Sequence, residues 1–182
     1  MKKWFIGILI FLLLFSFGCP EEKPESPWLE PDESFLLYDS FEGKFKLKYP
    51  SDWSIEGTSS QAGIVFRAPD KDSKIIVKSI TLFEVYSSIT IEEYNEIVVS
   101  DLSKNPEIKK IDSKETTLNE EPAIRLIYVI ESEEKNTEVL AVLMIKNERV
   151  YSIEFIALKE EFKSNLENAA KIIGSFETAY LR

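Results

Sequence analysis

Alternating apolar and polar positions along the middle of the chain predict a series of short β-strands. Phe45, Leu47 and Tyr49 would point to one face of a strand and the intervening lysines to the other, and Pro50 ends the pattern. Further runs rich in β-branched and aromatic residues predict strands at 53–55 (continuing the first after a short break), 64–66, 75–82, 108–118, 123–130, 137–145 and 150–157. The polar connections between the last four are short, so neighbouring strands are expected to run antiparallel.

Two other stretches repeat their apolar residues at helical intervals. The first follows Thr90, which has Glu93 three residues later in the spacing of a capping box, and it ends before Pro106. The second runs from about residue 159 to 173, and Gly174 stands where a helix commonly stops. Two helices grouped onto a single antiparallel sheet make an α+β domain, an antiparallel β-sheet flanked by helices.

The first eighteen residues have the pattern of a secretory signal peptide. Two lysines precede an apolar run from Trp4 to Phe17. As a helix that run reaches only ~21 Å, short of the ~30 Å hydrocarbon core of a bilayer. It ends in Ser16-Phe17-Gly18-Cys19, which resembles a lipobox, so we expect residues 1–18 to be a signal peptide and Cys19 to carry lipid. An uncleaved anchor, or a plain signal peptide with an incidental cysteine, is the alternative.

The residues after Cys19 alternate prolines with glutamates. Proline disfavours helix and sheet, and like charges repel, so residues 19–37 are expected to form an extended tether and residues 38–182 the folded domain. Two acyl chains suffice for stable membrane attachment. The sequence therefore predicts a protein that is lipid-anchored to the cell membrane and faces the extracytoplasmic side.

Composition excludes several classes of chemistry. The chain has 0 histidines and 1 cysteine, so Ser-His-Asp and Cys-His triads, histidine-containing zinc sites and an intrachain disulfide are all absent. Its formal net charge of −10 has the wrong sign for nucleic acid, and no nucleic-acid partner is expected.

Carboxylates are the remaining candidates for chemistry. Asp70 and Asp72 flank a turn and are the residues we single out as calcium ligands, since hard cations prefer oxygen donors from flexible loops; no other cofactor is expected. A carboxylate-based hydrolase would need two acids converging in a cleft, and the further acidic groups lie in a predicted cap or loop: Glu92, Glu93, Glu131, Glu133 and Glu134. A solvated turn is the plainer interpretation of Asp70 and Asp72.

The lysines at 44, 46 and 48 form a stripe on the first predicted strand. Such a stripe is typical of an edge strand that resists unwanted pairing, and contact with an acidic partner is the alternative.

Three segments in this order resemble the PsbP family, including its prokaryotic PsbP-like lipoproteins. They are Tyr38 with residues 42–53 (EGKFKLKYPSDW), residues 118–128 (LNEEPAIRLIY) and residues 172–176 (IIGSF). The resemblance implies an α/β/α sandwich around an antiparallel sheet. It also implies an accessory role, as in plant members that bind a photosystem at the lumenal face and help it to retain calcium and chloride. Tyr49, Trp53, Phe66 and Phe176 are expected to be core aromatic residues.

Together these patterns predict a non-catalytic, lipid-anchored accessory or binding module for a membrane protein complex or a ligand. A calcium-binding extracytoplasmic protein is the first alternative, and a carboxylate-based hydrolase is the second.

Overall fold

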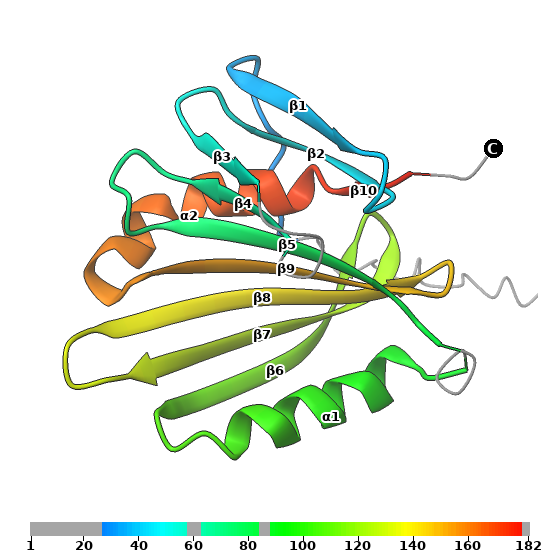
Figure 1. The fold of residues 1–182 in the computed structure, drawn as a ribbon, viewed down its shortest axis with the longest axis vertical. Helices are drawn as coiled ribbons and strands as arrows, with labels where there is room; N and C mark the ends of the chain where they lie inside the picture. Colours follow the sequence, from blue (N-terminus) through cyan, green and yellow to red (C-terminus); the bar gives the residue numbers. More distant parts are fainter. Residues whose placement is uncertain (1–26, 58–62, 84–87, 180–182) are drawn as a thin grey trace, which may run out of the picture.

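The computed structural model describes residues 27–57, 63–83 and 88–179, which form two antiparallel sheets and two helices (Figure 1). The smaller sheet has the order β1-β2-β10, with bounds β1 Phe35–Ser40, β2 Phe45–Pro50 and β10 Glu177–Thr178. The larger sheet has the order β3-β4-β5-β9-β8-β7-β6, with bounds β3 Ser54–Gly57, β4 Ile64–Arg67, β5 Lys74–Thr81, β6 Ile108–Leu118, β7 Glu121–Glu131, β8 Asn136–Lys146 and β9 Arg149–Leu158. The helices are α1, Ile91–Ser103, and α2, Lys159–Gly174. The predicted α+β class and the antiparallel pairing are confirmed.

The expectation of a single sheet is wrong, because the chain changes sheets after Pro50. The N–H of Trp53 donates to the carbonyl of Pro50 at 3.0 Å, and this turn separates β2 from β3. Trp53 itself is buried in the core. β3 then pairs with β4 in the larger sheet, whereas β2 pairs with β1 and β10. Residues 53–55 therefore do not continue the first strand.

β1 lies partly inside the segment that the sequence assigned to the tether. It begins at Phe35, three residues before the expected boundary at residue 38. Its adjacent Leu36 and Leu37 are both exposed, so its sequence does not alternate. An edge strand paired on one side only needs no strict alternation, which is why the pattern did not reveal it.

The larger sheet is covered on both faces, as the α/β/α arrangement requires. Alternation along β8 sends Leu140 and Val142 to a core cluster shared with α2, and Ala141 and Leu143 to a second cluster shared with α1. Figure 1 shows α1 next to β6, whereas α2 lies with the smaller sheet. The two helices thus cover opposite faces.

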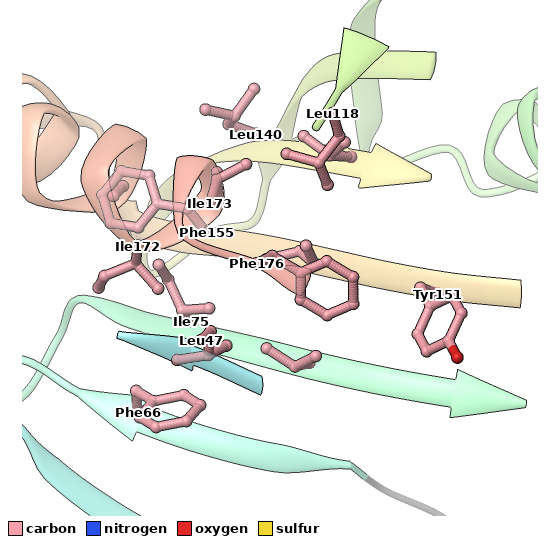
Figure 2. Packing of buried hydrophobic residues seen from close by; sticks show 14 of the residues in the cluster. Leu47, Phe66, Ile75, Leu118, Leu140, Tyr151, Phe155, Ile172, Ile173 and Phe176 are labelled. Carbon is pink, nitrogen blue, oxygen red and sulfur yellow. The ribbon is translucent and has the colours of Figure 1, made fainter. Parts of the chain in front are cut away.

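The main core lies between α2, the smaller sheet and one face of the larger sheet. Figure 2 shows Phe155 of β9 with Ile172 and Ile173 of α2, and Tyr151, farther along β9, next to Phe176. The rings of Phe45 and Phe176 stack with their centroids 5.4 Å apart. Of the aromatic residues expected in the core, Trp53, Phe66 and Phe176 are buried and Tyr49 is half-buried against them.

Local sequence signals explain how α1 begins. Thr90 accepts a hydrogen bond from the Glu93 N–H at 3.2 Å, and the Glu93 carboxylate accepts one from the Thr90 N–H at 2.9 Å. This confirms the predicted capping box. Among the described residues, neither helix is long and apolar enough to cross a membrane.

Candidate binding groove beneath α1

A partly open groove of about 250 Å³ lies between α1 and the face of the larger sheet that α1 covers. We call it the α1 groove. Its walls come from α1 and from strands β5, β7, β8 and β9. They are mainly apolar, and the lining residues are Lys78, Ile80, Tyr94, Val98, Leu102, Leu126, Tyr128, Ala141, Leu143, Val150, Ser152 and Glu154.

The period of two along β9 explains the polar residues of the groove. Tyr151, Ile153 and Phe155 point into the main core, so Ser152 and Glu154 point to the opposite face, toward α1. α1 packs against β6, β7 and β8, and the polar side chains of β9 therefore lie beyond the part of the sheet that the helix covers most closely.

An ion pair forms the polar end of the groove. Lys78 Nζ of β5 lies 3.0 Å from Glu154 Oε1 of β9, and the Ser152 hydroxyl donates to the same carboxylate oxygen at 2.8 Å. Only 18% of the Glu154 side chain and 36% of the Lys78 side chain is exposed. The two charges compensate each other at a site that is partly withdrawn from water.

Two tyrosines face this pair from α1 and β7. Burial, reinforced by the negative charge of Glu154, raises the pKa of Tyr128 to about 12. The same two causes, burial first, raise the pKa of Tyr94. Both phenols therefore stay protonated and uncharged at neutral pH, as donors or acceptors of hydrogen bonds.

The groove suits binding better than acid–base catalysis. Glycosidase-type hydrolysis requires two carboxyl groups about 5–9.5 Å apart. Glu154 is the one carboxylate among the described residues that line the α1 groove, and Lys78 already neutralises it. An apolar cavity with a few convergent polar groups is instead typical of a small-molecule site.

A second hollow of about 650 Å³ lies where the β1–β2 turn meets the ends of β5 and β9. Its walls include the exposed side chains Ile80 and Phe83 and the guanidinium of Arg149. Arg149 donates to the hydroxyls of Ser79 and Thr81 and to the carbonyl of Glu42. Its cation is therefore engaged in holding the two sheets together, and the α1 groove is the stronger candidate.

Asp70 and Asp72, the predicted calcium ligands, lie in the turn between β4 and β5. Asp70 Oδ1 accepts from the N–H groups of Asp72 and Ser73 at 2.9 and 2.8 Å, and Oδ2 accepts from the Asn165 amide of α2 at 2.7 Å. Burial alone would raise the pKa of Asp70, but these hydrogen bonds outweigh it and hold the pKa below its usual value. Asp72 points to Lys135 instead, at 3.5 Å. Calcium binding at this turn stays a prediction.

The other acidic residues do not converge. Glu93 belongs to the capping box of α1, and Glu92 beside it is exposed. Glu131, Glu133 and Glu134 are exposed at the turn between β7 and β8. In the described part of the chain, no three carboxylate or cysteine side chains cluster as a metal site would require.

The lysine stripe does not mark an edge strand, and that expectation is wrong. β2 lies between β1 and β10 in the smaller sheet. Lys46 pairs with Glu177 of β10 at 2.8 Å, and Lys44 Nζ lies 4.0 Å from the centre of the Phe41 ring. Lys44 and Lys46 therefore serve contacts within the fold.

Sequence reasoning missed one feature and indicated another. The Lys78–Glu154 pair joins residues 76 positions apart, and only strand pairing brings them together. Trp28, within the expected tether, donates its indole N–H to the Thr117 carbonyl at 2.8 Å and packs against the main core. An apolar pair, Trp28 and Leu29, is unusual in a proline-rich segment and indicates local docking of this kind. Cys19, the predicted lipidation site, lies outside the described residues.

These features define a small α+β module with an apolar groove on one face. Residues 23–178 match the PsbP-like protein family, and the chain belongs to that family. The resemblance seen in the sequence is thereby confirmed. No curated protein matches this chain.

Solved structures share the fold at low sequence identity. Cyanobacterial PsbP (CyanoP) from Synechocystis sp. PCC 6803 is 14% identical, with a TM-score of 0.59 over 81% of this chain and 94% of that chain. LpqN of Mycobacterium tuberculosis, described as involved in cell envelope biogenesis, is 20% identical, with a TM-score of 0.56 over 75% and 83% of the two chains. The Saccharomyces cerevisiae Ran-binding protein Mog1p is 12% identical, with a TM-score of 0.53 over 79% and 95%. At these identities the likeness shows the fold alone.

Proposed function

We propose that this chain is a non-catalytic binding module, held at the outer surface of a cell membrane by lipid on Cys19. The observation that carries the proposal is the α1 groove, whose apolar walls surround one charge-compensated ion pair. That arrangement can hold a partner or a ligand but offers no free pair of carboxylates for acid–base chemistry.

The comparisons support binding rather than catalysis. Similar folds occur in a protein named for binding Ran and in one described as involved in cell envelope biogenesis. The PsbP-like family adds the implication of an accessory role beside a membrane complex. For this chain we therefore propose a membrane protein complex, or a ligand delivered to one, as the partner.

The anchor part of the proposal rests on the lipobox-like end of the signal segment. We expect Cys19→Ser to move the protein from the membrane fraction to the medium or the periplasmic fraction, because the thioether-linked lipid can no longer form. Fractionation of cells expressing the full chain, with mass spectrometry of the mature N-terminus, measures this.

The matched control is Ser16→Ala, which keeps a small residue in the lipobox-like segment and should leave the protein in the membrane fraction. A Cys19→Ser protein that stays membrane-bound would overturn the lipid anchor. Affinity purification of the membrane-held form then identifies the complex it accompanies, and measurable turnover of a substrate would overturn the non-catalytic assignment.

A further inference from the structure

The charges of the α1 groove are balanced before any ligand enters. The charged groups that line it are Lys78 of β5 and Glu154 of β9, and they pair with each other at 3.0 Å. Tyr94 of α1 and Tyr128 of β7 complete its titratable lining, and both are uncharged at neutral pH. A ligand therefore meets no unpaired charge in the groove.

From this balance we infer that the α1 groove binds a small, uncharged, mainly apolar molecule that carries one hydrogen-bonding group such as a hydroxyl or a carbonyl. The inference deepens the proposed function, on which it rests, by naming the ligand class of the same site.

The ion pair disfavours charged ligands of either sign. A cation that bound Glu154 would displace Lys78 and leave its ammonium without a partner. An anion that bound Lys78 would leave the Glu154 carboxylate unpaired, at a position where only 18% of that side chain reaches solvent. An unpaired charge that is partly shielded from water is energetically costly. A neutral ligand avoids this cost, whereas a cationic and an anionic ligand each incur it.

The tyrosines supply the polar contact. Tyr128 is only 9% exposed, and its hydroxyl has no hydrogen-bond partner among the groups of the described chain. A buried phenol normally makes such a bond. A ligand hydroxyl or carbonyl next to Tyr128 would satisfy it while the apolar part of the ligand lies against Val98 and Leu143.

Size restricts the ligand further. The groove of about 250 Å³ lies just below the ~300–1,000 Å³ typical of pockets for drug-sized molecules. A single ring or a short alkyl chain fits, whereas a lipid with two acyl chains does not.

Three probes with one skeleton and different head groups test the inference: 4-phenylbutan-1-ol, 4-phenylbutylamine and 4-phenylbutyrate. Titration calorimetry and ligand-observed NMR at pH 7 measure their binding to the folded chain. We expect the alcohol to bind at least about tenfold more tightly than either ion. Equal or tighter binding of an ion, or no binding of any of the three, overturns the inference.

Two variants each remove one charge of the Lys78–Glu154 ion pair. Lys78→Met removes the cation, so the amine should become the preferred probe. Glu154→Gln removes the anion, so the butyrate should become preferred. A preference that stays unchanged in both variants would show that the probes bind elsewhere and would overturn the site. Far-UV circular dichroism monitors folding.

A third variant covers the case in which these polar changes prevent folding. Val98→Trp on α1 fills the groove and should abolish binding of the alcohol, whereas Ile97→Trp at the neighbouring exposed position should leave it unchanged. Binding that survives Val98→Trp overturns the site. Failure of the probes leaves the Cys19 fractionation and the partner purification untouched, so failure of this inference can be told apart from failure of the proposed function.

Discussion

At the scale of single residues, Tyr128 couples the α1 groove to the stability of the fold. Burial, with the nearby charge of Glu154, raises its pKa from 10.0 to about 12. The phenol is thus more acidic in the unfolded chain than in the folded one. A raised pKa contributes stability that is present in full below pH 10, and this stability is lost as the pH rises toward 12.

Tyr128→Phe tests this coupling. Phenylalanine cannot ionise. As the pH rises from 9 to 11.5, the free energy of unfolding of the variant should therefore fall by about 2 kcal/mol less than that of the parent. Urea unfolding across that range measures the difference, and the comparison at pH 8, where the phenol is protonated in both states, is the control. Parallel stability curves for the two proteins would contradict the assignment.

Asp70 shows how one carboxylate can be committed to structure. Its oxygens accept hydrogen bonds from Asp72, Ser73 and Asn165, which joins the β4–β5 turn to α2. A calcium ion at this turn would have to share those oxygens with N–H donors or displace them. The sequence could indicate the turn from its acids, but it could not show that an asparagine 95 residues away supplies one of the donors.

At the scale of elements, α1 depends on its first turn. The helix has 13 residues and one buried residue, Ile91, so sheet packing secures it less than it secures α2. The capping box satisfies backbone donors that would otherwise lack partners. Because α1 forms one wall of the groove, the cap also supports the binding site.

We therefore expect Thr90→Ala to lower the free energy of unfolding by about 1 kcal/mol. Urea unfolding followed by circular dichroism measures the change. Ser103→Ala is the matched control, since the Ser103 hydroxyl donates only to the Val99 carbonyl of the same helix, and this variant should be nearly neutral. Equal effects of the two substitutions would show that the cap does not limit the stability of α1.

Element by element, the sequence predicted most of the larger sheet and both helices. Hairpins such as β6–β7 and β8–β9 follow from strong alternation and short polar turns, and both turns place two residues at positive φ, Asn119 with Glu120 and Asn147 with Glu148. β10 was missed because two residues carry no period. The division into two sheets was missed because it depends on which strands pair across the chain, and local pattern does not contain that information.

The difference between local pattern and strand pairing also decides how much of the candidate site could be predicted. Ser152 and Glu154 sit at alternate positions of a predicted strand, so their common face could be predicted. That Lys78 and Tyr128 would lie beside them could not be predicted, because the strand order β5-β9-β8-β7 is a property of the whole sheet. The sequence therefore indicates which residues share a face of a strand, but it does not indicate that these faces line a groove.

At the scale of the whole molecule, the segment before β1 belongs to the folded domain. Trp28 packs against the main core and donates its indole N–H to Thr117 at the end of β6. The chain at Trp28 and Leu29 passes close to the end of α2. A Cβ on Gly174 would lie 2.6 Å from the Leu29 carbonyl oxygen and 2.9 Å from the Trp28 Cβ. Only a residue without a side chain allows this approach, so Gly174, the last residue of α2, accommodates the incoming chain.

Trp28→Ala should lower the free energy of unfolding by about 2 kcal/mol, from lost packing and from a carbonyl that loses its donor. For a domain of this size that corresponds to roughly 4–8 °C in Tm. Leu37→Ala is the matched control, because the Leu37 side chain is 62% exposed and its removal should cost little.

A chain that starts at residue 38 should be destabilised more than Trp28→Ala, since it also lacks Phe35 and half of β1. A chain that starts at residue 27 should melt like the parent. Equal melting temperatures for the chains that start at 27 and at 38 would show that the folded domain begins where the sequence alone placed it.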